Sequence, residues 1–250
     1  MSQVTKRERH IAHLKNSDNW MDYLKVHSGL PGKRSDLELL EIVAELGDER
    51  FFLECLRYDE VIAPTNTPGE FIATCGVTGL GKLITEGKDN YYDLLKAYAS
   101  DSRWRVREGV AFALQIIGKW NFDSLIHRLL EWKNGNPFEK RAVVAGLCEP
   151  ALIIERKNAQ KVLALLEDIF HSIETISDRK SESFRVLKKG LGYGLSVAMV
   201  ADPQKGRELL EKLLQIPDRD IKWILRENLK KKRLERMDRD WVDKMIKEIT

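Results

Sequence analysis

The stretch that decides the fold is DSRWRVREGVAFAL at residues 101–114, which is matched later in the chain by DRDIKWILRENL at residues 218–229. Each stretch begins with an acid, continues with basic residues around a tryptophan, and carries apolar side chains at helical spacing. Weaker copies begin near Thr67, Pro137 and Glu182. Because units of similar length recur, the sequence predicts an all-α, right-handed α-solenoid in which antiparallel helix pairs stack on one another.

Local signals divide the rest of the chain into about 12 to 14 helices, and no period-2 strand is evident. SDLE at residues 35–38 and TPGE at 67–70 are capping boxes, and Asn158 is placed to cap a helix. A long apolar helix is expected over 184–200, and a final pair over 218 to about 233 and 238–249. We expect residues 1–34 to form N-terminal capping helices and residues 35–250 to form the repeat array, together as one continuous domain.

Composition excludes several classes of protein. With 43% hydrophobic and 32% charged residues, the chain of 250 residues can bury a core beneath a charged surface. A net charge of +3 does not by itself indicate nucleic-acid binding. The N-terminus is too polar for a signal peptide, and no apolar run reaches the ~18 residues of a membrane span, so a cytoplasmic location is expected. The three cysteines form no CxxC pair and are expected to be reduced core residues.

No complete catalytic motif is evident, and we expect neither a cofactor nor a metal. GVTGLGK at residues 76–82 fits the first seven positions of a P-loop, but Leu83 stands where Ser or Thr should hold magnesium. Because this stretch lies inside a capped helix, its glycines are expected to let two helices approach closely. His10 and His13 share a helix face, but two imidazoles are fewer than a zinc site requires.

Basic and aromatic residues cluster in successive repeats and form the candidate binding stripe: Arg103, Trp104, Arg105, Arg107, Lys140, Arg141, Lys222, Trp223 and Arg226. Lys188, Lys189 and Lys230–Arg233 extend it. On an exposed concave face the cations would bind the phosphate backbone of a nucleic acid, and the indoles would stack on its bases. Structural roles are the alternative: Arg107 would pair between repeats, the tryptophans would fill grooves, and Lys230–Arg233 would complement a helix C-terminus.

The residues of the first copy resemble a HEAT repeat, on the pattern of Asp101, Trp104, Val106, Arg107, Ala111 and Leu114. The resemblance covers about residues 35–250, is shared with uncharacterised bacterial HEAT-repeat proteins, and implies a ladder of Asp–Arg pairs between neighbouring repeats. The stretch SDSRWRVR at residues 100–107 is also similar to HEAT-like alkylpurine DNA glycosylases. That similarity implies a basic channel for DNA and an acid, here Asp101, beside the damaged base, although the paired-Trp-then-Asp motif of those enzymes is absent.

Two functions follow as expectations. The first is a non-enzymatic scaffold that binds another protein along its concave groove. The alternative is a nucleic-acid-binding protein related to the HEAT-like glycosylases, which requires Arg105, Lys140, Lys222 and Arg226 to project from one exposed face. Short HEAT-like repeats also occur in phycobilin lyases, which implies a third possibility, a regulatory subunit for a cofactor-modifying enzyme. Nothing in the chain marks a chromophore site.

Overall fold

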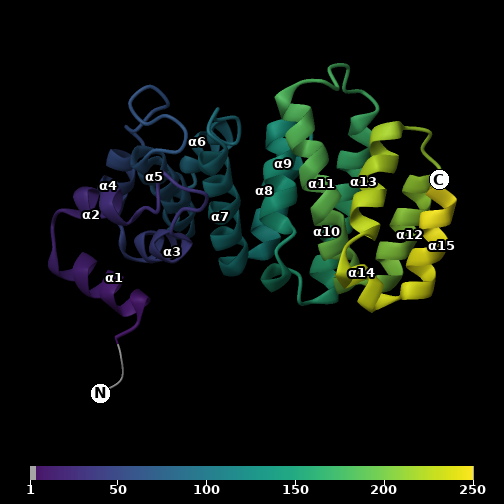
Figure 1. The fold of residues 1–250 in the computed structure, drawn as a ribbon, viewed down its shortest axis with the longest axis horizontal. Helices are drawn as coiled ribbons and strands as arrows, with labels where there is room; N and C mark the ends of the chain where they lie inside the picture. Colours follow the sequence, from purple (N-terminus) through teal and green to yellow (C-terminus); the bar gives the residue numbers. More distant parts are fainter. Residues whose placement is uncertain (1–3, 250) are drawn as a thin grey trace. The chain divides into compact units, whose positions relative to one another are not determined.

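The computed structural model describes residues 4–249, and within this range every regular element is a helix (Figure 1). Fifteen α-helices and one short 3-10 helix are present among these residues, which confirms the all-α prediction. Contacts divide the chain into two compact units, Met1–Ile117 (unit 1) and Gly118–Thr250 (unit 2). None of the described helices is both long enough and apolar enough to cross a membrane.

Unit 1 is built around one buried helix. Its elements are α1 (Lys6–Asn16), α2 (Trp20–His27), α3 (Leu37–Leu46), α4 (Glu49–Cys55), α5 (Pro68–Thr85), α6 (Tyr91–Tyr98) and most of α7 (Trp104–Trp120). Helix α5 contacts α2, α3, α4 and α6, and nearly all of its residues are buried. As predicted, Thr67 caps α5 and Pro68 occupies its first turn. A helix that is apolar on all sides is expected at the centre of such a unit.

Glycines on α5 allow its neighbours to approach. A Cβ at Gly79 would lie 2.2 Å from the ring of Phe52 on α4, and a Cβ at Gly81 would lie 2.6 Å from the carbonyl oxygen of Ala113 on α7. Both glycines belong to the stretch that resembles a P-loop. The stretch is therefore a helix-packing surface, as expected, because its N–H groups lie within α5 instead of opening a phosphate-binding loop.

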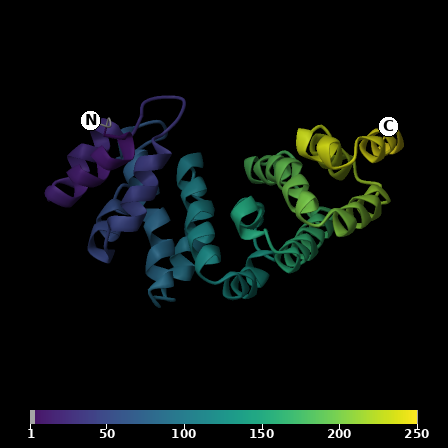
Figure 2. The same ribbon diagram turned by 90° about the horizontal axis from the view of Figure 1, so that it is seen from below.

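Unit 2 consists of two layers of helices. Its elements are α8 (Phe122–Trp132), α9 (Pro137–Leu147), the 3-10 helix η1 (Pro150–Leu152), α10 (Arg156–Ile173), α11 (Glu182–Ala201), α12 (Pro203–Leu214), α13 (Arg219–Leu229), α14 (Lys232–Met237) and α15 (Arg239–Ile249). Helix α11 contacts α9 and α13 in one layer, and α10 contacts α8 and α12 in the other (Figure 2). The layers also meet, since α10 and α12 pack on α11.

Three predicted helix boundaries are wrong. The cap of α3 is Asp36, not Ser35, and α10 begins before Asn158, whose side-chain amide donates to the carbonyl oxygen of Leu152. The helix expected over 218–233 is two helices, because the chain turns after Leu229 and thereby buries Leu234 completely. Lys232 and Arg233 consequently lie in the first turn of α14, where the helix dipole does not stabilise a cation.

Candidate functional site

The arginines of the predicted stripe in unit 1 lie inside the protein. Arg103, Arg105 and Arg107 are 2%, 5% and 4% exposed, respectively. The Arg103 guanidinium donates to both carboxylate oxygens of Asp101 at 2.9 Å and to the carbonyl oxygens of Tyr58 and Ala63 at 2.8 and 3.1 Å. Arg103 therefore fastens the loop before α5 to the start of α7. The carboxylate of Asp101 is engaged by this arginine.

Arg105 and Arg107 have similar structural roles. Arg105 pairs with the fully buried Glu70 of α5 at 3.0 Å and donates to the carbonyl oxygen of Gly32 at 3.0 Å. Arg107 donates to the carbonyl oxygens of Asp101 and Ser102. Of the four stripe residues in unit 1, only Trp104 is on the surface, at 47% exposure, with the Arg105 guanidinium 4.5 Å from its ring. The expectation that Arg105 projects into solvent is therefore wrong.

In unit 2 the predicted stripe is also broken up. Lys140 is 7% exposed, and burial lowers the pKa of its ammonium. The expectation that this lysine projects into solvent is therefore wrong. Arg141 is half-buried. Lys222 and Trp223 are half-buried as well, and the ammonium of Lys188 covers the Trp223 ring at 4.4 Å. Arg226 is exposed and donates to the carbonyl oxygen of Ile249 at 2.7 Å.

The remaining basic segment, 230–233, contacts an aromatic side chain that does not belong to the predicted stripe. Tyr193 projects from α11 and is 53% exposed. The guanidinium carbon of Arg233 lies 4.4 Å from the centre of the Tyr193 ring, and the Lys231 ammonium lies 5.7 Å from it. Gly194 faces inward, where a Cβ would lie 2.6 Å from Val144. The glycine-rich run 190–194 thus packs α11 closely on α9 and α13 and leaves the tyrosine exposed.

Beside this stack lies an open apolar groove of about 570 Å³, which we call the Tyr193 groove. Its lining residues come from η1 and the segment after it, from α11 and from α14: Pro150, Ile153, Ile154, Tyr193, Val197, Val200, Ala201 and Arg233. Ile154 is 82% exposed and Val200 is 36% exposed. Exposed apolar side chains therefore lie together here, with one charged side chain among the lining residues.

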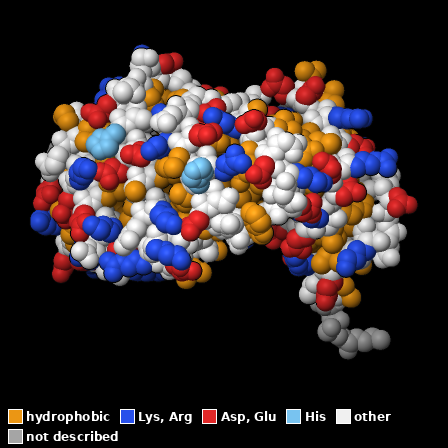
Figure 3. All heavy atoms as spheres, turned by 180° about the vertical axis from the view of Figure 1, so that it is seen from behind, with side chains coloured by type: hydrophobic (Ala, Val, Ile, Leu, Met, Phe, Trp, Pro, Cys, Tyr) orange, Lys and Arg blue, Asp and Glu red, His pale blue; other side chains and the backbone are white. Residues whose placement is uncertain are grey.

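Aliphatic side chains make up most of the lining of the groove. Arg233 is its one charged lining residue, and the nearby Cys148 is buried, which raises the pKa of its thiol to about 12 and keeps it protonated. Within residues 4–249, no three metal-ligating side chains lie close enough together to hold an ion. On the face drawn in Figure 3, Lys and Arg side chains are interspersed with Asp and Glu side chains and apolar patches.

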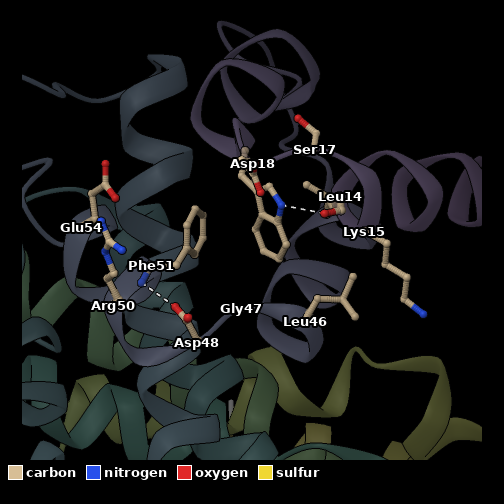
Figure 4. A pocket seen from close by; sticks show the side chains of 11 residues that line it. Leu14, Lys15, Ser17, Asp18, Leu46, Gly47, Asp48, Arg50, Phe51 and Glu54 are labelled. Carbon is tan, nitrogen blue, oxygen red and sulfur yellow. Dashed lines mark hydrogen bonds between the residues drawn. The ribbon is translucent and has the colours of Figure 1, made fainter.

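Unit 1 contains a second pocket of about 570 Å³ between the α1–α2 and α3–α4 connections (Figure 4). Trp20 and Phe51 meet edge to face there at 4.8 Å, and the Trp20 indole donates to the carbonyl oxygen of Leu14 at 2.8 Å. The charged lining residues are Lys15, Arg50, Asp18, Asp48 and Glu54. The indole is thus already bonded, and the lining residues carry both signs of charge.

A histidine cluster also lies in unit 1. His10 is 4% exposed, with Nδ1 2.8 Å from the Tyr23 hydroxyl and Nε2 3.4 Å from the Asp36 carboxylate. His13 stacks on Tyr23, and His27 packs against it. The sequence indicated that His10 and His13 share a face, but their partners come from α2 and from the loop before α3. These side chains bond mainly to one another and line neither pocket.

Tyr193 and the apolar side chains beside it therefore form the best-supported binding surface in the described part of the chain. A signal for it is present in the sequence, as a tyrosine between two helix-packing glycines and a basic run about 40 residues later. Only the fold brings the two together. Among family models, curated proteins and solved structures, none matches this chain.

Proposed function

We propose that this protein is a non-enzymatic helical-repeat scaffold and that it binds a protein partner through the Tyr193 groove. The observation that carries the proposal is the groove itself, where Ile154, Tyr193 and Val200 expose apolar surface next to Arg233. Leaving such side chains in water is unfavourable, at about 25 cal/mol per Å² of apolar area. A partner that covers them recovers this free energy.

The pairing of charged residues supports the repeat part of the proposal. In unit 1, Glu70 on α5 pairs with Arg105 on α7. In unit 2, Lys188 on α11 pairs with Asp220 on α13 at 2.7 Å. Both pairs join a helix to the second helix after it, as a ladder between repeats would. Together with the two layers of unit 2, these links favour an α-solenoid of HEAT-like type.

The alternative, a nucleic-acid-binding protein related to HEAT-like DNA glycosylases, has less support. Arg105 and Lys140, two of the four cations that it requires on one exposed face, are buried. Asp101, the acid that would face a damaged base, is bonded to Arg103. The Tyr193 groove is lined by aliphatic side chains, which a phosphate backbone does not satisfy.

Site-specific photo-crosslinking in the source cell tests the proposed function. A benzophenone amino acid at position 200, in the groove, is compared with one at Leu130 on α8, which has a similar exposure of 42%. We expect position 200 to give a discrete polypeptide adduct that Ile154→Glu abolishes and that position 130 does not give. The same adducts at both positions, or none at position 200, would contradict the proposal.

A further inference from the structure

Building on this proposed function, we infer that the Tyr193 groove binds an acidic polypeptide segment, one that places aliphatic side chains in the groove and carboxylates against Lys231 and Arg233. The charges on the α14 side of the groove favour this partner; on the η1 side Glu149 and Glu155 flank the lining residues, and Glu155 is paired with Lys157. Residues 227–237 contain five Lys or Arg residues and two Glu residues. Glu227 is already paired with Lys230. Within residues 4–249, no carboxylate lies within ion-pair distance of Lys231, Lys232 or Arg233.

Tyr193 holds these cations ready for a carboxylate. Its ring lies beneath the Arg233 guanidinium and within cation–π distance of the Lys231 ammonium. Lys189 is one helical turn before Tyr193 on α11 and is exposed. Side chains that are ordered before binding lose less entropy when a partner arrives. The ring therefore acts as a positioning residue for the two cations as well as part of the apolar wall.

The apolar floor distinguishes this partner from a nucleic acid. Ile153, Val197 and Val200 line the groove, whereas a phosphate backbone needs donors along its whole path. A peptide can place aliphatic side chains on this floor and direct its carboxylates to one edge. Apolar anchors bordered by complementary charge are a usual mode of recognition between proteins.

A display library of random 12-residue segments, selected on the full-length chain, tests this inference. We expect the enriched segments to combine Leu, Ile, Val or Phe with Asp or Glu, and the binding of a synthesised representative to weaken as salt rises. Enrichment of apolar segments without acids would overturn the acidic partner and leave the proposed protein-binding function intact. If the library yields no segment that binds at the groove, both the acidic partner and the proposed protein-binding function are wrong.

Matched variants locate the contact. Tyr193→Phe keeps the ring and is expected to bind the selected segment within about twofold of the native chain, whereas Tyr193→Leu loses the cation–π contacts and is expected to bind about fivefold more weakly. The double variant Lys231→Glu, Arg233→Glu is expected to lose about tenfold or more. Lys33→Glu, at an exposed lysine of unit 1, is the charge control and should bind normally. Thermal melts establish that each variant is folded.

Two further results would overturn the inference. Duplex DNA or single-stranded DNA that displaces the segment at about 200 mM salt would assign the groove to nucleic acid. Self-association that the Lys231→Glu, Arg233→Glu variant abolishes, measured by sedimentation, would make a second copy of the chain the occupant. If Tyr193→Leu binds as well as Tyr193→Phe, the positioning role of the ring is wrong.

Discussion

Arg103 and Asp101 form an ion pair inside unit 1, with Nη2 of the arginine 2.9 Å from Oδ2 of the aspartate. The same guanidinium donates to backbone carbonyl oxygens in the loop between α4 and α5, including that of Tyr58. The Arg103 guanidinium, which belongs to the stretch that decides the fold, thus holds this loop in place. Its loss would remove the charged donor to the Asp101 carboxylate, which would keep the backbone N–H of residue 103, and the guanidinium donor to the carbonyl oxygens of Tyr58 and Ala63.

Arg103→Ala is therefore expected to destabilise the protein by about 3–5 kcal/mol, as when one partner of a buried ion pair is removed. Arg103→Lys should recover only part of this, because an ammonium cannot bond to the carboxylate and to several carbonyl oxygens with the geometry of a planar fork. Urea denaturation of the two variants measures the free energy of unfolding. Arg50→Ala, at an exposed arginine of α4, is the control and should change it by less than about 0.5 kcal/mol.

Gly81→Ala is expected to destabilise by about 1–3 kcal/mol, because the new methyl group would lie 2.6 Å from a backbone carbonyl oxygen of α7, and a backbone atom is displaced less easily than the end of a side chain. The matched substitution is Gly190→Ala in α11, where the nearest atom is in the flexible Arg141 side chain at 3.3 Å. There the gain in helix propensity, about 0.5–1 kcal/mol, should make the change neutral or stabilising. Equal melting temperatures for the two variants would refute the helix-packing role of Gly81.

The buried carboxyl of Asp202 is expected to make the folded protein less stable in acid. Hydrogen bonds, first of all from Arg156, lower the pKa of this buried carboxyl from 3.8 to about 2. Because the folded-state pKa is depressed, the stabilisation is present above about pH 4 and is lost as the pH falls towards 2. Asp202→Asn can still cap α12, so it isolates the charge and should lose about 2 kcal/mol at neutral pH. Denaturation across pH 2–6 should show a flatter profile for this variant than for the exposed control Asp243→Asn.

The buried imidazole of His10 is expected to make the stability of the protein depend on pH a second time, nearer to neutrality. Burial lowers the pKa of its imidazole below the ordinary value of 6.5, although the nearby Asp36 opposes this shift. The unfolded chain then binds a proton that the folded chain does not, so stability should fall as the pH drops below about 6.5. NMR titration of the His10 side chain should give a midpoint below 6.5. A midpoint at or above 6.5 would show that the effect of Asp36 exceeds that of burial.

Features set by a few neighbouring residues were predictable from the sequence. The cap at Thr67 with Pro68 after it and the apolar stripe of α7 are local patterns of hydrogen bonding and periodicity. The close approach at Gly79 and Gly81 was predictable for the same reason, since a helix without Cβ atoms on one face invites packing. These patterns determine helices and their faces before any long-range contact forms.

Only the tertiary structure decided which charged and aromatic side chains face the solvent. A cation is buried when carboxylates and carbonyl groups surround it, and those of Arg103 and Arg105 include partners about 35 to 45 residues earlier in the chain. Tyr193 remains exposed because the neighbouring Gly192 and Gly194 form the face of α11 that packs against other helices. Arg233 reaches Tyr193 because the chain turns after Leu229 and buries Leu234. Helical periodicity is a local property of the chain, whereas the cost of burying a charge depends on the partners that the fold supplies.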